Sequence, residues 1–260
     1  MKILYWNICE GCEPEARFEA LLSCLANESA DIVGLSELNG WQEEGFARMQ
    51  ITADRLGLPH YVFCESESGY HLGLFSRYPI FYSRLLLKPF KTGCILAKIS
   101  TSISEVMIVL THLHSDFEEK RMQEVTLILE AIPTDIPAIL MGDLNTLSLS
   151  DLYDETNLIS TFQNFGISKF GKGFLDRRVI PEIIRHGLID TLRVYSRDFE
   201  YSVPTTANED PMHCMPLRLD YIFVTKDLVD QMIDAQIICS ECVENVSDHF
   251  PCRAEFKLRI

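Results

Sequence analysis

The chain has 260 residues, of which 47% are hydrophobic, and its formal net charge is −15. This composition excludes a disordered chain, and the length allows a substantial core. The excess of acidic residues disfavours attraction to the phosphates of nucleic acid or to an anionic membrane. No stretch approaches the roughly 20 apolar residues of a membrane span, and the run MKILYWN is too short for a signal peptide. A cytoplasmic protein is therefore expected.

Short runs rich in Val, Ile, Leu and Phe recur along the chain and predict buried strands. In chain order these strands cover residues 3–6, 32–35, 72–75, 106–110, 139–141, 221–224 and 235–239. Residues 17–25 and 118–132 have the periodicity of amphipathic helices. Residues 147–217 are the least regular part, where long loops and short helices are expected. Because no repeat or linker interrupts the chain, we expect one α/β domain over residues 1–260.

The nine cysteines are an odd number in a chain of this size. They do not resemble a disulfide framework, so reduced thiols are expected. Two CxxC pairs occur, at Cys9–Cys12 and Cys239–Cys242, and they would bind zinc if the fold brought them together. Since the pairs lie near opposite ends of the sequence, unrelated thiols are the favoured reading.

Polar side chains stand at the ends of most of these strands. Each one alone is explained as a cap, a turn residue or a hydrogen-bonded core histidine. Loops at the ends of a sheet converge to form sites, however, so the whole set predicts one functional site. The set comprises Asn7, Glu37, His112, His114, Asp143, Asn145, Asp220, Asp248 and His249.

The chemistry of this set favours a particular reaction. Carboxylate and amide oxygens suit a hard cation such as Mg²⁺ or Mn²⁺. The histidines lack the HxxxH or HExxH spacing of a metal site and suit proton transfer or contact with phosphate. A carboxylate beside the cation can orient and deprotonate water, while imidazole or metal stabilises negative charge on phosphate oxygens. Metal-assisted hydrolysis of a phosphate ester fits best.

Seven short motifs follow one another between Trp6 and Pro251: WN, LSEL, GLFSRYPI, THLHS, GDLN, RLDYIF and SDHFP. In this order they resemble the endonuclease/exonuclease/phosphatase superfamily. That superfamily includes DNase I, abasic-site nucleases, neutral sphingomyelinases, inositol-polyphosphate phosphatases, deadenylases and tyrosyl-DNA phosphodiesterases. The resemblance implies a four-layer α/β-β/α sandwich, in which two packed mixed sheets are flanked by helices and the site lies at one rim.

The resemblance also implies a metal centre. Glu37 would be the main metal ligand, with Asn7 close to it and Asp248 near the metal. Two positions depart from the pattern of many members. Ser36 stands where many have Gln, and Cys9 occupies the place of an acid in the WNxDG motif of abasic-site nucleases.

The catalytic residues follow from the later motifs in the same way. Asp143 would orient or deprotonate the attacking water, and Asn145 would bind beside it. His249 would contact the scissile phosphate and be held by Asp220, while His112 would be a second phosphate contact. On this reading, the turn at GDLN exists to present Asp143 and Asn145.

Substrate contacts are expected from basic segments. The family counterpart of GYHLGLFSRYPI borders the substrate pocket, which makes His71 and Arg77 candidate substrate contacts. An ordinary strand-end histidine explains His71 equally well. The segment from Arg77 to Lys98 contains no acidic residue and predicts a local positive rim. A second group of bases either meets an anionic substrate or forms a solvated surface: Lys169, Lys172, Arg177 and Arg178.

The expected function is a divalent-metal-dependent phosphodiesterase or phosphatase that acts on a phosphate ester. The loop VPTTANEDPMHCMPLRLDY lacks the aromatic residue that nucleases of the superfamily often carry there. Together with the charge of −15, this makes duplex DNA a poor substrate. Two alternatives remain: a DNA or RNA nuclease of the same fold, and a non-catalytic binding module. The complete set of polar residues argues against the second.

Overall fold

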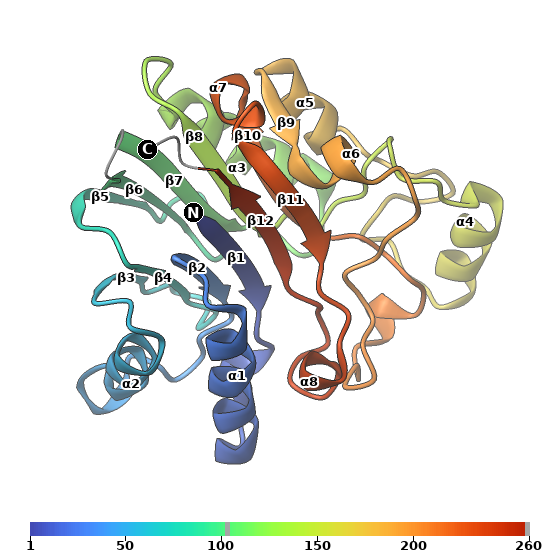
Figure 1. Ribbon diagram of the computed structural model, residues 1–260. Coiled ribbons are helices and arrows are strands. Elements are labelled where there is room, and N and C mark those ends of the chain that lie inside the picture. The colour runs from blue at the N-terminus through green and yellow to red at the C-terminus, as the bar shows by residue number, and fades with distance from the viewer. Residues whose placement is uncertain (102–104, 258–260) are drawn as a thin grey trace.

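The computed structural model describes residues 1–101 and 105–257, and their strands form two six-stranded sheets (Figure 1). The first sheet has the order β11 (Met232–Ile237), β12 (Cys252–Phe256), β1 (Lys2–Asn7), β2 (Ile32–Ser36), β4 (Leu72–Ser76) and β3 (His60–Cys64). The second has the order β5 (Ile80–Leu86), β6 (Cys94–Ser100), β7 (Glu105–His112), β8 (Ala138–Asp143), β10 (Asp220–Thr225) and β9 (Leu188–Asp190). Both sheets are mixed, because β1 runs parallel to β2 and β7 parallel to β8.

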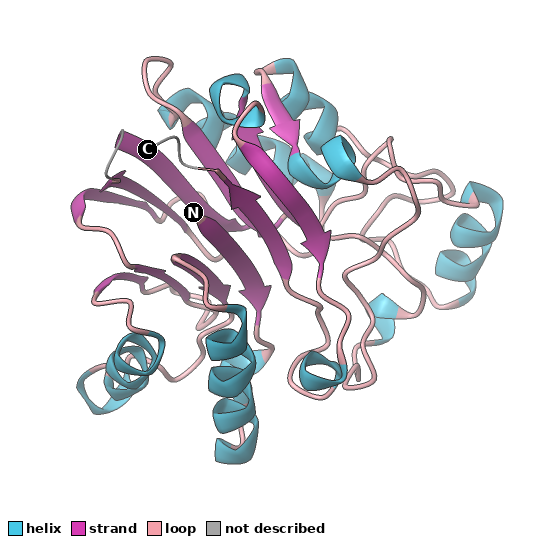
Figure 2. Ribbon diagram, viewed as in Figure 1, coloured by secondary structure: helices cyan, strands magenta, loops and turns pink. Residues whose placement is uncertain are grey.

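Helices flank the two sheets, which lie face to face (Figure 2). The longer helices are α1 (Glu15–Glu28) and α2 (Ala47–Leu56) against the first sheet, and α3 (Glu118–Ala131) and α5 (Val179–Arg185) against the second. The other α-helices are α4 (Glu155–Asn164), α6 (Thr191–Tyr195), α7 (Lys226–Val229) and α8 (Glu241–Glu244). Three 3₁₀ helices are η1 (Glu10–Cys12), η2 (Glu43–Gly45) and η3 (Pro211–His213). The predicted four-layer sandwich is confirmed.

Alternation of side chains along the central strands explains the layers. In β7, Ile108 and Leu110 point into the core between the sheets, while Met107 and Val109 pack on the side of α3 and α5. Both faces of this strand are covered, so it reads as a continuous apolar run. Close packing of the sheets also requires Gly34 in β2, because a Cβ there would lie 2.6 Å from the terminal methyl of Met141.

Residues between β8 and β10 form a lobe beside the sandwich, with α4 at its outer end (Figure 1). The expectation of long loops and short helices there is confirmed, and β9 adds one short strand. The lobe has its own apolar cluster, made of Leu147, Leu158, Phe162, Ile167, Phe170, Val203, Leu217 and Leu219. It is joined to the sheet by Arg218, whose buried guanidinium pairs with Asp151 and Asp190.

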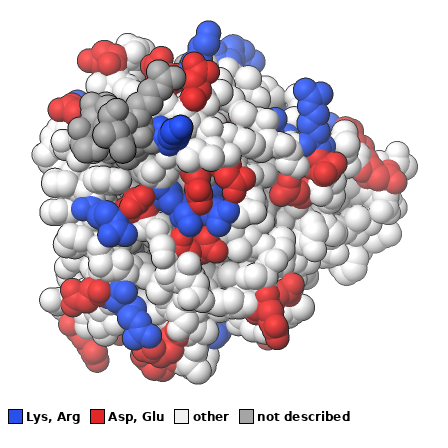
Figure 3. Space-filling view, in the orientation of Figure 1, with Lys and Arg blue, Asp and Glu red and all other residues white. Residues whose placement is uncertain are grey.

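The outer face of β11 and β12 carries charged residues, whereas Leu4 and Trp6 of β1 are buried next to α1 and α8. Figure 3 shows basic and acidic side chains interspersed at the centre of this face. Arg253 of β12 pairs there with Glu28, Asp234 and Glu255. Among the described residues, no helix is long and apolar enough to cross a membrane.

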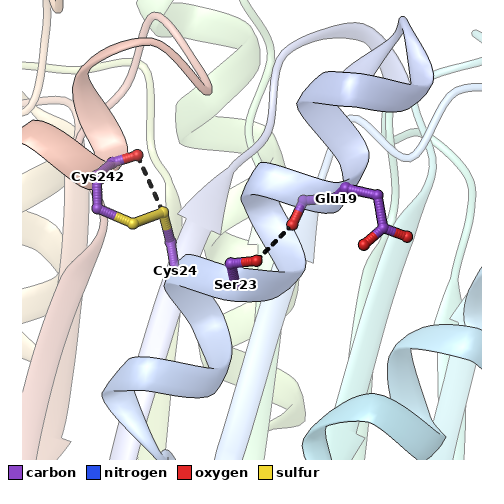
Figure 4. The surroundings of a disulfide bond; sticks show 4 residues. All are labelled: Glu19, Ser23, Cys24 and Cys242. Carbon is purple, nitrogen blue, oxygen red and sulfur yellow. Dashed lines mark hydrogen bonds between the residues drawn. A yellow bond between two sulfur atoms is a disulfide. The ribbon is translucent and has the colours of Figure 1, made fainter.

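The expectation that all cysteines are reduced is wrong. Cys24 of α1 and Cys242 of α8 form a disulfide, with their Cα atoms 6.0 Å apart (Figure 4). The two residues are 218 positions apart in sequence, so only the packing of α8 against α1 reveals the pair. Because Cys242 is bonded to Cys24, the two CxxC pairs do not form a four-cysteine zinc site.

Candidate active site

The strand register brings three predicted site residues side by side. Asp143 at the end of β8 is paired with His112 of the parallel strand β7 on one side. On its other side it is paired with Asp220 of the antiparallel strand β10. Neighbouring residues in register point to the same face of a sheet, so all three side chains face the first sheet. Asn7 at the end of β1 reaches across to them.

Asp143 lies at the centre of this group. Its Oδ2 atom accepts a hydrogen bond from Asn7 Nδ2 at 3.2 Å and lies 3.5 Å from His112 Nε2 and 3.8 Å from His249 Nε2. Burial opposes ionisation, but the two histidines outweigh it and the pKa of Asp143 is lowered. Asp143 is therefore an ionised, buried carboxylate between two imidazoles.

The turn that follows β8 fixes this carboxylate. Asn145 adopts a left-handed conformation with φ 53°, and its main-chain N–H donates to Asp143 Oδ1 at 2.9 Å. The side-chain Nδ2 of Asn145 donates to the main-chain oxygen of Leu113 at 2.9 Å, which joins the turn to the end of β7. Asn tolerates this backbone region better than most residues, and this explains the amide in GDLN.

His249 and Asp220 form a buried pair. His249 Nδ1 lies 2.7 Å from Asp220 Oδ2, and the ring nitrogen Nε2 points toward Asp143. Burial opposes the charged imidazolium, but Asp220 and Asp248 outweigh burial and raise the pKa of His249 to about 10. Near neutral pH the ring is therefore a cation held in place by Asp220.

Glu37 follows β2 in a left-handed conformation with φ 64°. Its Oε1 accepts from Asn7 Nδ2 at 3.0 Å, and its Oε2 accepts from the main-chain N–H of Glu10 at 3.0 Å. The segment that supplies this N–H has positive φ at four consecutive residues, Cys9 to Cys12. Strained backbone of this kind is typical of functional sites and persists only where the surroundings fix it.

Cys9 stands near the acidic groups of the predicted metal centre. Burial, Asp248 and Glu37 together raise the pKa of the Cys9 thiol to about 12. The thiol is therefore protonated near neutral pH and does not replace the acid found at this place in abasic-site nucleases. The pKa of Asp248 itself is lowered well below its ordinary value; burial opposes this, but His249 and His213 favour the charged form.

Most of these side chains line one cavity of about 810 Å³, whereas Asn7 and Asp220 lie outside its lining. Its walls carry an unusual density of carboxylates: Glu10, Glu13, Glu37, Asp143, Glu209, Asp210 and Asp248. Hard divalent cations prefer such oxygen ligands, and the donor set fits Mg²⁺ or Mn²⁺ at Glu37, Asp248 and Asn7. His249 also lies close to acidic groups, but it is a poor metal ligand because it is held as an imidazolium by Asp220.

His213, in the loop before β10, belongs to the site although no sequence pattern predicted it. This buried histidine lines the cavity, with its Nδ1 3.4 Å from Asp248 Oδ2 and its ring edge-on to that of His249 at 5.1 Å. His213 and Asp248 lie close enough, with His249, to share a cation. No spacing signal marks it, because it reaches the site through the fold of an irregular loop.

Two predicted substrate contacts lie outside the cavity. His71 is buried against Phe63, and its Nδ1 accepts from the main-chain N–H of Ser66 at 3.0 Å. Arg77 pairs with Asp31 at the opposite end of β2 from Glu37. The lining of the cavity includes neither residue.

The predicted basic rim does not form as a continuous surface. Arg77 pairs with Asp31, Lys88 with Glu67, and Lys91 with Asp116. Acidic residues from elsewhere in the sequence therefore pair with three of the five bases in the run, and Lys91 alone of these three lines the cavity. In the second basic group, Arg177 pairs with Glu155. Arg178 pairs with both Asp176 and Glu119.

Comparison with known proteins agrees with this arrangement. A model of the Endonuclease/Exonuclease/phosphatase family matches residues 4–249. The chain belongs to this family. No curated protein sequence matches the chain. Members of the family are hydrolases of phosphate esters, so the chain carries the fold and the general chemistry that the motifs indicated.

Solved structures of the family share the fold over the whole chain. An AP endonuclease from Archaeoglobus fulgidus is 20% identical with a TM-score of 0.74, covering 99% of this chain and 100% of its own. The 3′ phosphatase NExo from Neisseria, bound to a product DNA hairpin, is 18% identical with a TM-score of 0.72, covering 98% and 99%. A humanized TDP2 from D. rerio is 22% identical with a TM-score of 0.65, covering 98% and 97%. These likenesses concern the fold alone.

Proposed function

We propose that the protein is a divalent-metal-dependent phosphoesterase that hydrolyses a phosphate ester with water. The observation that carries this proposal is the buried, ionised carboxylate of Asp143 between His112 and His249 at the base of an acidic cavity. A carboxylate in this position can orient water and accept its proton, while a neighbouring imidazolium stabilises negative charge on phosphate.

The roles of the residues follow from their hydrogen bonds. Asp143 accepts a hydrogen bond from the attacking water and takes its proton as the new bond to phosphorus forms and the bond from phosphorus to the leaving oxygen breaks. The departing alkoxide takes a proton from solvent water. Its low pKa makes it a weak base, so orientation of the water is its larger contribution. His249 donates from Nε2 to a phosphate oxygen, with its ring fixed by Asp220, and His112 donates to a second oxygen. Asn145 and Asn7 hold Asp143 in place.

Glu37, Asp248 and Asn7 are the residues that would hold the metal. A bound Mg²⁺ or Mn²⁺ supplies positive charge next to the phosphate oxygens and favours deprotonation of water. The hydrogen bonds from Asn7 and from Glu10 N–H orient the Glu37 carboxylate for this purpose.

The cavity walls favour a compact substrate over a long polyanion. Apart from the residues around Asp143, the walls include Glu10, Glu13, Glu209 and Asp210. These carboxylates would repel the phosphates that flank the cleaved bond in a duplex. A compact substrate has only one phosphate group, and that group would face the histidines and the metal. We therefore propose that the substrate is a small or terminal phosphate ester. We also propose that the protein is cytoplasmic and consists of a single domain.

The Glu37→Gln variant tests this function. The amide keeps the size of the side chain but removes the charge that a hard cation requires. We expect Mn²⁺ affinity by calorimetry to fall by at least about tenfold and hydrolysis to fall by at least about a hundredfold, with thermal stability retained. Activity would be screened on phosphomonoesters, phosphodiesters, sphingomyelin, inositol phosphates and oligonucleotides.

A matched control is Glu67→Gln, because Glu67 is an exposed acid that pairs with Lys88 outside the cavity. It should leave metal binding and hydrolysis unchanged. Turnover of Glu37→Gln at the wild-type rate without added metal would refute the metal-dependent mechanism. Cleavage of abasic or plasmid DNA in preference to every small ester would identify a nuclease of the same family.

A further inference from the structure

Three Lys or Arg side chains line the cavity, and two of them already make hydrogen bonds or ion pairs within the protein. The guanidinium of Arg17 donates to the main-chain oxygens of Ile8 and Cys9, both at 3.0 Å, and of Val246 at 2.9 Å. The ammonium of Lys91 donates to Ser115 Oγ at 2.6 Å and lies 3.5 Å from Asp116 Oδ2. These two cations stabilise the loops that form the cavity walls.

Lys169 is different, because its side chain is largely buried and its ammonium group, which contacts the Phe170 ring, has neither a hydrogen-bond nor an ion-pair partner among the described residues. Its residue is 6% exposed and lines the cavity. Within residues 1–101 and 105–257, no group makes a hydrogen bond or an ion pair with its Nζ atom, which lies 5.3 Å from the ring centroid of Phe170. Burial lowers the pKa of Lys169, and Asp143 is the charge that most opposes this shift.

The backbone around Lys169 is fixed by the surrounding structure. The main-chain oxygen of Lys169 accepts a hydrogen bond from Arg121 Nη2 at 2.6 Å. The next residue, Phe170, is buried in the lobe and stacks on Phe162 with ring centroids 5.1 Å apart. Lys169 is therefore held at the junction of the lobe and the sandwich, unlike an ordinary surface lysine.

Arg121 also fixes the backbone of a second cavity wall, which is formed by the loop after β7. Arg121 Nη1 donates to the main-chain oxygens of His114 and Ser115, in the loop that follows His112. One side chain thus fixes the loop beyond β7 and the loop that carries Lys169. The position of Lys169 relative to the site is determined by this shared contact.

A buried ammonium without a partner destabilises the folded protein, because it loses hydration and gains no ion pair. Such a group is characteristic of functional sites, where the compensating charge arrives with the ligand. The cavity that Lys169 lines is the one proposed to take a phosphate ester. An anionic oxygen is the partner that the ammonium lacks.

We propose that Lys169 binds a non-bridging oxygen of the substrate phosphate. This inference rests on the proposed function, and it assigns the lobe a direct part in recognising the phosphate. Phosphomonoesters and phosphodiesters both present such an oxygen, so the chemistry is common to the two classes. A monoester carries a second negative charge, so it gains more than a diester from an additional cation.

Inorganic phosphate is the probe for this proposal, because it binds without turnover. Calorimetry would compare the wild type with Lys169→Met and with Lys172→Met, in the presence and absence of Mg²⁺. Lys172 is an exposed lysine three residues further along that does not line the cavity. We expect Lys169→Met to weaken phosphate binding at least tenfold, and Lys172→Met to leave it unchanged.

Thermal unfolding separates a binding role from a structural one. Without phosphate, Lys169→Met should be at least as stable as the wild type, because it removes an unpaired buried charge. With phosphate, only the wild type and Lys172→Met should gain stability. A lower melting temperature of the free Lys169→Met protein, or phosphate affinity equal to that of the wild type, would overturn the proposal.

Two further measurements complete the test. The side-chain NMR signal of Lys169 in the wild type should shift when phosphate is added; an unchanged signal contradicts the proposal even if the variant fails to fold. Steady-state kinetics should show a larger loss of kcat/KM on a monoester than on a diester. If no ester is hydrolysed at all, but Lys169→Met still loses phosphate binding, the proposed function fails while the assignment of Lys169 stands.

Discussion

Among the neighbours of His249, Asp220 has the largest effect on its charge state. The ring is buried and would be neutral in an apolar pocket, yet the carboxylate at 2.7 Å makes the cation the stable form. A cation at this position can stabilise a phosphate before and during the reaction. The pair is therefore the part of the site whose electrostatics can be tested most directly.

Replacing Asp220 with Asn should lower the pKa of His249 from about 10, because burial is then opposed only by the remaining carboxylates, Asp248 and Asp143. In the wild type the folded pKa is raised, so the pair stabilises the fold fully below the ordinary pKa of about 6.5 and loses this effect as pH rises through about 10. NMR titration of the His249 ring and urea unfolding between these pH values measure both effects. A His249 pKa that is the same in both proteins would contradict the pairing.

The same pair should act as one unit in catalysis. Asp220→Asn frees the ring and lowers its pKa, while His249→Ala removes the cation. Each should cost at least about a hundredfold in kcat. Because both variants remove one function, the double variant should lose little more than the worse single. Steady-state kinetics on one substrate decide this, and multiplicative losses would show that the two residues work independently.

Which site residues the sequence revealed depends on where they lie. Asp143, His112 and Asp220 end or begin apolar strands, so both their position and their mutual contact follow from a strand pattern. His213 lies in an irregular segment with no periodicity, where contact with the site depends on tertiary packing. Lys169 was one of four bases expected either to meet an anionic substrate or to face solvent, and the fold places it in the cavity lining. His71 is the opposite case. The strand that follows it was predicted, but its side chain packs against Phe63, away from the cavity.

At the scale of the elements, the first turn of α3 joins several parts of the site. Arg121 and Glu118 form a buried ion pair with Nε and Oε2 2.8 Å apart. Glu118 Oε1 accepts from Thr146 in the turn after β8 and from the main-chain N–H of Val179 at the start of α5. With the contacts of Arg121 to the loop after β7 and to Lys169, this pair holds four segments around the cavity.

Arg121→Met should therefore destabilise the protein strongly. It leaves Glu118 buried without its counter-ion, and breaking a buried pair from one side costs about 3–5 kcal/mol. Arg178→Met is the control, because that arginine is half exposed and its pairs contribute less than about 1 kcal/mol. Urea unfolding followed by circular dichroism measures both. A loss in Arg121→Met no larger than in the control would show that α3 does not organise the site.

Most strands that the sequence revealed are buried on both sides, although the half-exposed β11 was predicted and the buried β6 was not. The strands β7 and β8 read as continuous apolar runs because one face meets the other sheet and the other meets helices. The strands β3, β5 and β6 and the helix α2 were not predicted. In β5 most residues are exposed, as expected of an edge strand, so its sequence IFYSRLL lacks a buried pattern.

For the whole molecule, the net charge of −15 is the property that most affects the choice of partner. The basic run between Arg77 and Lys98 was expected to oppose this charge locally. Three of its five bases instead pair with acids brought close by the fold, namely Asp31, Glu67 and Asp116. A linear sequence does not reveal this neutralisation, since the partners come from different segments.

Binding to duplex DNA should therefore be weak. At about 0.15 M salt we expect a Kd no tighter than about 10⁻⁶ M, within the non-specific range and far from the roughly 10⁻⁸ M of specific DNA proteins. Fluorescence anisotropy on a labelled duplex measures this over a range of salt concentrations. The double variant Glu67→Gln/Asp116→Asn releases Lys88 and Lys91 from their ion pairs, so it should bind several-fold more tightly and with a steeper salt dependence. Nanomolar binding by the wild type, or no gain in the variant, would mean that intramolecular pairing does not limit access to DNA.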